Sequence, residues 1–311
     1  MDGLQVSLFG RLSVKWAGEE AVGFEAKKVQ ELFAYLLIYR TRTHSREVLA
    51  ELLWGDRQSA QSRKYLRQAL WQLQGVLERA SISDDDHLLD VDPEWVRLNS
   101  SARLWLDVVE VERAYAQAQG LAGSDLTDEC AHALEKAVQL YRGDLLEGCY
   151  QDWCIFERER LQSIYLAMLD KLTQCCEVHR RYEPGLAYGA QALRYDRARE
   201  RTHRRMMRLY YLAGDRTSAL RQYEQLVRAL REDLDVTPAR RSVELFEQIR
   251  ADALEITSPS GGAVLETRRS KGDRAHPDPT MHLRHLHGLL TLLQRQIRQE
   301  IEAIEVALTD S

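Results

Sequence analysis

The hydrophobic positions of the first hundred residues predict short strands followed by three helices. Residues 1–16 alternate loosely between apolar and polar side chains and break at Gly10, which is typical of strands joined by a turn. Residues 25–40, 45–54 and 62–73 instead repeat their apolar positions every three or four residues, as amphipathic helices do. The side chains expected to be buried are Val29, Leu32, Phe33, Leu36 and Leu37 in the first helix, Val48, Leu49, Leu52 and Leu53 in the second, and Tyr65, Leu66, Ala69, Leu70 and Leu73 in the third.

Cap and turn residues complete this pattern. Ser45 is a good N-cap for the second helix, and Gly55 is placed to end it. The turn formers Asp92 and Pro93 lie between two short apolar runs, which predicts a β-hairpin. Strands, three helices and a hairpin follow the order of a winged helix-turn-helix. In that fold the helix before the hairpin enters the major groove of DNA.

The third helix has a cationic face. No acidic residue occurs from Ser59 to Gln74, although acids outnumber bases by five in the whole chain. At ~100° per residue, the polar side of this helix holds Arg63, Lys64, Arg67 and Gln68. Arginine pairs with guanine, glutamine with adenine, and lysine with phosphate. We therefore predict that these four residues contact promoter DNA; the alternative is an ordinary solvated helix face.

Three further cations are candidates for contacts with the DNA backbone. Arg46 opens the second helix, Arg97 lies in the hairpin, and Lys28 stands at the start of the first helix. Such contacts hold a protein in register without reading sequence. For Lys28 a solvated lysine is an equal alternative, and the acidic run at 84–86 argues against DNA contact along the whole hairpin region.

From Leu104 to Ile256 the chain is expected to be almost entirely helical. The segments 180–193 and 214–227 overlay at an offset of 34 residues, with Gly185 matching Ala219, which is typical of tetratricopeptide repeats. The expected fold is mainly α, with a winged helix-turn-helix at residues 1–100 and a tetratricopeptide-like domain at 104–256. Residues 257–280 are predicted to be a flexible linker and 281–311 an amphipathic helix with a nearly heptad apolar seam.

Composition excludes several classes of protein. The net charge is −5, so any DNA contact must come from a local patch. No apolar run is long enough to cross a bilayer and no signal peptide is recognisable, so we expect a cytoplasmic, nucleoid-associated protein without membrane contact. The five cysteines lack a C-x-x-C spacing, which favours reduced structural thiols. We find no catalytic motif, metal set or cofactor motif, and we predict that the chain is not an enzyme.

Several stretches resemble the SARP class, the Streptomyces antibiotic regulatory proteins. "LFGRLSV", "REVLAELLWGD" and "SRKYLRQALWQLQGVLE" are similar to its OmpR/PhoB-type DNA-binding domain. "LYRGDLLEG", "ERERL" and "RRMMRLYYLAGDRTSALRQYEQL" are similar to its bacterial transcriptional activator domain, and the resemblance covers residues 4–252. It implies an activator that binds repeated promoter sites as a dimer or higher oligomer, recruits RNA polymerase through the loop 55–59, and carries the DNA-reading residues on the third helix. Larger members add a nucleotide-hydrolysing domain, but the motif G-x-x-x-x-G-K-[ST] does not occur in this sequence, so that activity is not expected.

An arginine-rich stretch at residues 194–208 is the candidate regulatory site. Guanidinium groups bind phosphates bidentately, so this stretch predicts an anionic effector such as a nucleotide. The alternative is a charged helical surface held by ion pairs along the helix. For the chain as a whole, the alternative function is a tetratricopeptide scaffold that binds proteins and does not read DNA. The candidate effector-binding residues are Arg194, Arg197, Arg201, Arg204 and Arg205.

Overall fold

The computed structural model describes residues 3–55, 57–80, 87–99 and 101–254, all of which lie within a single compact unit. The expected linker at 257–280 and the expected helix at 281–311 lie outside these residues. Within the described residues, no helix combines the length and apolar character that a bilayer span requires.

A four-stranded sheet opens the chain. It contains β1 (Leu4–Ser7), β2 (Ser13–Trp16), β3 (Glu19–Glu20) and β7 (Leu104–Leu106), in the order β3-β2-β1-β7. Gly10 turns the chain between β1 and β2 with a φ of +87°, a conformation that favours glycine. Strand β7 corrects the expectation of helix from Leu104 onward, because residues 104–106 pair in parallel with β1.

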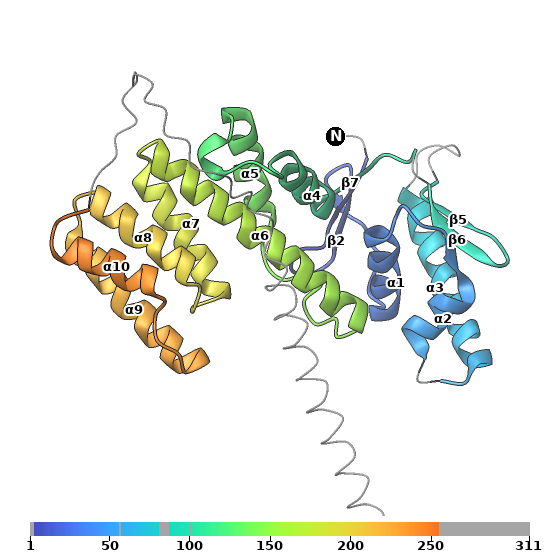
Figure 1. Ribbon diagram of the computed structural model, residues 1–311. Coiled ribbons are helices and arrows are strands. Elements are labelled where there is room, and N and C mark those ends of the chain that lie inside the picture. Colours follow the sequence, from blue (N-terminus) through green and yellow to red (C-terminus); the bar gives the residue numbers. More distant parts are fainter. Residues whose placement is uncertain (1–2, 56, 81–86, 100, 255–311) are drawn as a thin grey trace, which may run out of the picture. The chain divides into compact units, whose positions relative to one another are not determined.

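The predicted order of three helices and a hairpin is confirmed, and Figure 1 shows it at one end of the described chain. Strands β4, β6 and β5 form a second, three-stranded sheet. Ser45 occupies the N-cap of the second helix but its side chain makes no capping bond, and Val48 is 57% exposed rather than buried. The elements are α1 (Lys27–Ile38), β4 (His44–Ser45), α2 (Arg46–Trp54), α3 (Ser59–Ala80), β5 (Leu89–Val91) and β6 (Trp95–Leu98).

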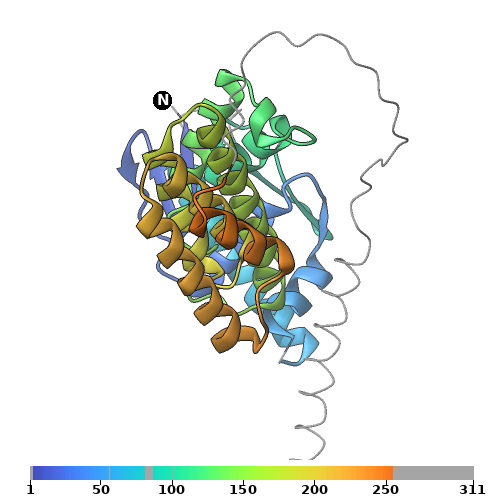
Figure 2. The same ribbon diagram turned by 60° about the vertical axis from the view of Figure 1, so that its left-hand side comes forward.

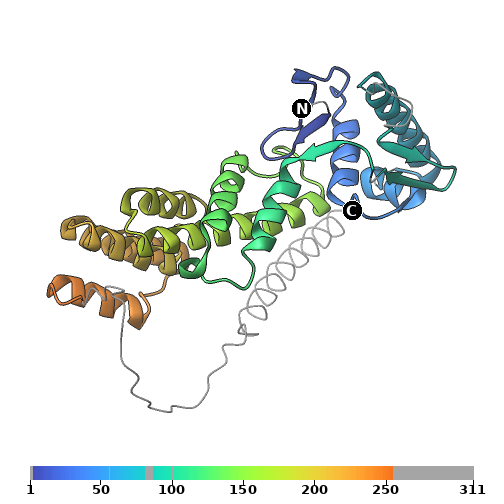
Figure 3. The ribbon, with the colours of Figure 1, turned by 90° about the horizontal axis from the view of Figure 1, so that it is seen from above.

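The rest of the described chain is helical, as the periodicity predicts. Helix α6 packs against α1 through the edge of Trp153 on the ring of Tyr35, and at its other end against α7 and α8. Figures 1 and 3 show α7 to α10 stacked on that half of α6, and Figure 2 brings α8 to α10 forward. The bounds are α4 (Asp107–Gln117), η2 (Gly123–Asp125), α5 (Asp128–Leu140), α6 (Asp152–Val178), α7 (Tyr182–Tyr195), α8 (Glu200–Leu212), α9 (Arg216–Leu234) and α10 (Arg240–Arg250).

The repeat seen in the sequence is a repeat of structure. Helices α7 and α9 begin at Tyr182 and Arg216, 34 residues apart. Each follows a residue with positive φ, Arg180 at +56° and Gly214 at +84°, so the same turn is made by an arginine in one repeat and a glycine in the other. The matched Gly185 and Ala219 are both buried where helices cross.

One hydrophobic core runs through most of this body. It extends from Leu4 in β1 to Ala192 in α7 without a break between the regions 1–100 and 104–256. A smaller cluster holds α8, α9 and α10 together around Met207, Ala219 and Ile249. All five cysteines are buried and their thiols are free.

Candidate nucleic-acid interface

Helix α3 presents its cationic side to solvent. Leu66, Leu70 and Leu73 are buried against α1 and α2, as the periodicity predicts. The opposite side carries the predicted DNA-contacting residues, and all four are exposed: Arg63, Lys64, Arg67 and Gln68. Trp71 is 75% exposed on the same helix. The four residues therefore share one accessible helix face.

The angle between α2 and α3 is fixed by a buried serine. The Ser62 hydroxyl donates to the Trp54 carbonyl at 2.7 Å, the last residue of α2. Its backbone N–H also bonds back to the Gln58 carbonyl at 3.0 Å, which starts the helix. The Tyr65 ring lies tilted, 6.5 Å from the Trp54 ring. The Trp54 carbonyl at the end of α2 also accepts from the Arg57 N–H at 3.0 Å, so two hydrogen bonds converge on it.

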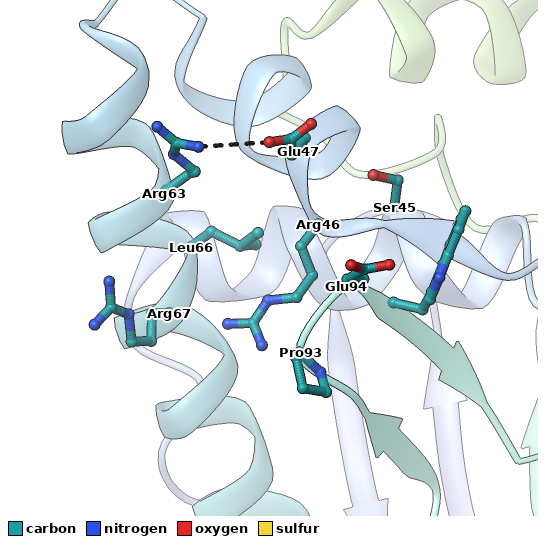
Figure 4. A pocket seen from close by; sticks show the side chains of 9 residues that line it. Ser45, Arg46, Glu47, Arg63, Leu66, Arg67, Pro93 and Glu94 are labelled. Atoms are coloured by element: carbon teal, nitrogen blue, oxygen red, sulfur yellow. Dashed lines mark hydrogen bonds and ion pairs between the residues drawn. The ribbon is translucent and has the colours of Figure 1, made fainter.

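A depression of about 660 Å³ lies between α2, α3 and the β5–β6 hairpin. Three of the predicted cations line it: Arg46, Arg63 and Arg67. Figure 4 shows Arg63 and Arg67 standing on successive turns of α3, with Arg46 reaching across from α2 toward Pro93. Helices α2 and α3 thus place guanidinium groups around one concave surface that the β5–β6 hairpin also lines.

An acidic residue faces this surface. Glu47, in the first turn of α2, contacts Arg63 at 3.4 Å, and both side chains are exposed. Glu94 also lines the depression. The pair joins two helices, so the absence of acidic residues from α3 did not predict it. The sequence signal for this pair was Glu47 in the first turn of α2, but the helix dipole alone also favours an acidic residue at that position.

Two of the supporting cations are tied to the hairpin. Arg46 donates from Nη1 to the Asp92 carbonyl at 3.0 Å, and its backbone N–H donates to the Glu94 carbonyl at 2.9 Å. Arg97 is exposed on β6 and donates from Nε to Asp90 at 2.8 Å. Because both arginines keep exposed N–H groups, they add positive charge along the hairpin side of α3.

Lys28 is not part of this concave surface. Its ammonium pairs with the buried Glu31 at 2.8 Å and lies 6.0 Å from the centre of the Trp54 ring. These contacts place Lys28 between α1 and the end of α2, away from the residues that line the depression.

A buried carboxylate joins the N-terminal region, residues 4–98, to the helical region. Asp107 is 2% exposed and accepts hydrogen bonds from the backbone N–H groups of Leu8 and Phe9. Burial raises the pKa of Asp107, while these N–H groups and nearby Arg142 act in the opposite direction. The arrangement fixes the end of β1 onto the start of α4.

The segment "LYRGDLLEG" docks onto the same place. Leu146 N–H donates to the Leu8 carbonyl at 2.9 Å, and Glu147 N–H to the Gly10 carbonyl at 2.7 Å. Arg158 in turn donates to the carbonyls of Leu145, Leu146 and Cys149 at 2.9 to 3.2 Å. The most distinctive motif of the helical region therefore makes the joint between the two regions.

The five candidate effector-binding arginines do not form one site. Arg194 is exposed at the end of α7, and Arg197 pairs with Asp233 and Glu232 of α9. The other three, Arg201, Arg204 and Arg205, line a separate cleft on α8. Among the described residues, no cluster of three His, Cys, Asp or Glu side chains is suited to hold a metal ion.

Comparison with known proteins identifies the helical region. Residues 106–250 match the sequence family described as bacterial transcriptional activator domain. The chain therefore contains a bacterial transcriptional activator domain, as the resemblance to SARP-type regulators predicts. The search of curated proteins found no match.

A solved structure shares the fold of this chain. It is described as Mycobacterium tuberculosis EmbR in complex with a low affinity phosphopeptide, and it aligns with a TM-score of 0.68 at 19% sequence identity. The alignment covers 81% of this chain and 66% of EmbR, so about a third of EmbR has no counterpart in this chain. At this identity the likeness concerns the fold, which is mainly helical with small sheets near the N-terminus.

Proposed function

We propose that this regulator is a sequence-specific DNA-binding activator whose residues 4–98 act as a winged helix-turn-helix of the OmpR/PhoB type. Helix α3 would lie in the major groove and the β5–β6 hairpin would contact the flanking backbone. The observation that carries the proposal is the exposed face of Arg63, Lys64, Arg67 and Gln68, all on the helix that precedes the hairpin. Its place of action would be the cytoplasm, at the nucleoid.

We distinguish two kinds of proposed DNA contact: arginines that read base edges, and arginines that position the protein on the phosphate backbone. Arg63 and Arg67 lie one turn apart on α3, so both can reach base edges along one groove. Arg46, which is half-buried, and Arg97, which is exposed, are tied to the hairpin and placed for phosphates. Glu47 restrains the Arg63 guanidinium before DNA arrives, which limits the geometries that this side chain can use.

The remaining parts of the proposal concern partners. Binding to repeated promoter sites as a dimer or higher oligomer, and recruitment of RNA polymerase, follow from the resemblance to SARP-type regulators. The turn between α2 and α3 supports a polymerase contact, since Arg57, Gln58 and Ser59 are exposed. An anionic effector bound by the helical region would regulate this activity.

The deciding experiment combines genome-wide footprinting with a binding titration on the recovered site. Replacing both Arg63 and Arg67 by alanine is expected to weaken operator binding by a factor of 100 or more, since each bidentate pair contributes about 1–3 kcal/mol. Replacing Arg228 and Arg231, exposed on α9, serves as the charge-matched control. Binding of the wild-type protein should also weaken steeply with salt. A tetratricopeptide scaffold that does not read DNA would give no footprint and no effect of either pair.

A further inference from the structure

The arginine cleft on the helical region has a composition that the fold does not require. It lies between α6, α8 and α10 with a volume of about 510 Å³, within the range of small-molecule sites. Five arginines line it, whereas Leu245 is the one apolar side chain among its lining residues. A site with this lining recognises charge rather than apolar surface.

The arginines are arranged along a line. Arg201, Arg204, Arg205 and Arg208 recur on one side of α8 at the spacing of successive turns. At about 1.5 Å per residue, the first and last are about 10 Å apart along the helix axis. Arg241 faces them from α10. The cleft therefore offers guanidinium groups over the length of several linked phosphates, and from two sides.

The acids at the cleft do not satisfy these arginines. Asp170 contacts both Arg201 at 2.7 Å and Arg205 at 3.4 Å. Glu177 likewise lies 2.8 Å from Arg208 and 3.9 Å from Arg205. Three guanidinium groups with five N–H donors each thus share two carboxylates. Both carboxylates belong to α6, and their ion pairs restrain the side chains of these three arginines.

The other two arginines of the cleft, Arg204 and Arg241, have fewer ion-pair partners. Arg204 donates to the Ser242 hydroxyl at 3.0 Å and lies 3.6 Å from Glu200. Glu200 is itself occupied by the Ser242 hydroxyl and the Ala239 N–H. Arg241 has no ion-pair or hydrogen-bond partner among residues 3–254 of the described chain. Glu244, the other carboxylate that lines the cleft, accepts from Arg240 at 2.6 Å. Donors in the cleft therefore exceed acceptors.

Arg205 shows the electrostatic consequence. Its side chain is 14% exposed, and burial lowers its pKa, with Asp170 opposing the change and Arg201 adding to it. Crowding several cations around a half-buried guanidinium is unfavourable unless a counter-charge is supplied.

We propose that this cleft binds a small anion carrying two or more linked phosphate groups, held by Arg204, Arg208 and Arg241. Asp170 holds Arg201 and Arg205, Glu177 holds Arg205 and Arg208, and the ligand joins α8 to α10. The inference deepens the proposed effector regulation by naming the site and the ligand class. Arg194 and Arg197, predicted from the sequence, are outside it, whereas Arg208 and Arg241 belong to it.

The experiment is calorimetry on the full chain at near-physiological salt with inorganic triphosphate, pyrophosphate, orthophosphate and citrate as probes. Triphosphate is expected to bind about tenfold more tightly than orthophosphate, and more tightly than citrate, because it can engage several guanidinium groups at once. Equal binding of citrate and triphosphate would overturn the assignment to phosphates, and absence of binding by all three phosphates would overturn the site.

Two matched variants locate the binding. Arg241→Gln and Arg228→Gln each remove one exposed arginine that makes no ion pair within the described residues. Arg241→Gln is expected to weaken triphosphate binding about tenfold, the effect of losing a charge-assisted hydrogen bond, and Arg228→Gln to leave it unchanged. Equal weakening by both variants would indicate a general charge effect and overturn the proposal.

Two further measurements separate this site from DNA binding. The Arg63→Ala/Arg67→Ala protein is expected to bind triphosphate with wild-type affinity, so that failure of DNA reading and failure of the cleft are distinguishable. ATP and GTP are then compared with triphosphate to distinguish a nucleotide from an inorganic polyphosphate. A short DNA duplex is finally tested as a competitor of triphosphate. If the duplex displaces triphosphate and binds the Arg63→Ala/Arg67→Ala protein as tightly as the wild type, the cleft is a nucleic-acid site and the small-ligand proposal is overturned.

Discussion

Asp107 accepts two hydrogen bonds from the backbone N–H of Leu8, at 2.8 and 3.0 Å, across 99 positions of sequence. The same carboxylate bonds the N–H of Phe9 at 3.1 Å and of Val108 at 2.8 Å. One buried side chain therefore satisfies the end of the first strand and the start of α4. The N-terminal and helical regions are therefore joined by hydrogen bonds to this carboxylate as well as by packing.

Replacing Asp107 by asparagine should destabilise the protein. Asparagine retains one acceptor oxygen and directs an N–H₂ group toward backbone donors, so at least one buried N–H loses its partner. We expect a loss of about 1–3 kcal/mol in the free energy of unfolding, measured by urea titration. Asp128→Asn, at an exposed position of α5, is the control and should change it by less than about 0.5 kcal/mol. Equal stabilities for the two variants would contradict this account of the joint.

Acidification should destabilise the fold partly through His203. Its ring is buried, its Nε2 lies 2.9 Å from the Arg197 carbonyl, and its Nδ1 lies 2.7 Å from the Gln222 amide nitrogen. The tautomer that satisfies both contacts donates from Nε2 and accepts at Nδ1. Burial lowers the pKa of His203, as it does that of His44.

The direction of this pH effect follows from the numbers of protons that the folded and unfolded chains bind. In the pH range below the ordinary histidine pKa of about 6.5, the unfolded chain binds protons that the folded chain does not, so stability is lost as the pH falls from about 7 toward the folded pKa. His203→Gln, which can make both contacts without titrating, should show a smaller loss between pH 7 and pH 5. The measurement is urea unfolding at each pH, and parallel pH profiles for variant and wild type would rule out this role.

Two glycine-to-alanine substitutions should act in opposite directions. A Cβ at Gly189 would lie 2.6 Å from Cγ of Met206 where α7 crosses α8, whereas a Cβ at Gly75 on α3 would meet nothing within 4 Å. Gly189→Ala is therefore expected to cost about 1–3 kcal/mol of unfolding free energy. Gly75→Ala should add about 0.5–1 kcal/mol, because alanine favours a helix interior. Thermal unfolding would test both, and stabilisation by Gly189→Ala would show that the crossing is looser than described.

The Glu47–Arg63 pair should influence specificity more than affinity. Glu47→Gln removes a negative charge from the concave surface and releases the Arg63 guanidinium. We expect binding to all duplexes to tighten a few-fold, on the order of 1 kcal/mol, and the ratio of operator to scrambled-sequence affinity to fall. Fluorescence anisotropy with both duplexes measures the ratio. Glu51→Gln, one turn further along α2, is the control, and a ratio unaffected by either change would show that Glu47 does not restrain Arg63.

Features that depend on nearby positions along the chain can be predicted from the sequence. The buried and exposed sides of α3 follow from helical periodicity alone, and Tyr182 and Arg216 begin their helices at the predicted offset. Strand β7 was missed because three residues are too few for a periodic signal, and their strand character depends on pairing with β1. Val48 was expected in the core because its spacing fits the stripe, but α2 turns that position to solvent.

The features of the site that could not be predicted from the sequence are contacts between segments that are far apart along the chain. Glu47 meets Arg63 only because the Ser62 hydroxyl fixes the angle between α2 and α3. Arg241 joins the arginine cleft from another helix, whereas Arg197, inside the arginine-rich stretch, is turned away toward Asp233. Composition along a stretch indicates charge, and tertiary packing decides which of those charges converge.

Strand β7 has a practical consequence for dissecting this protein. It supplies the outer neighbour of β1 from residues that lie beyond the hairpin. A fragment that ends near residue 100 would therefore leave the backbone N–H and C=O groups along one side of β1 without partners. Open strand edges recruit strands from other molecules. Such a fragment is expected to aggregate or to form artificial dimers, which could be mistaken for the natural oligomer, and the shortest faithful fragment extends at least through α4.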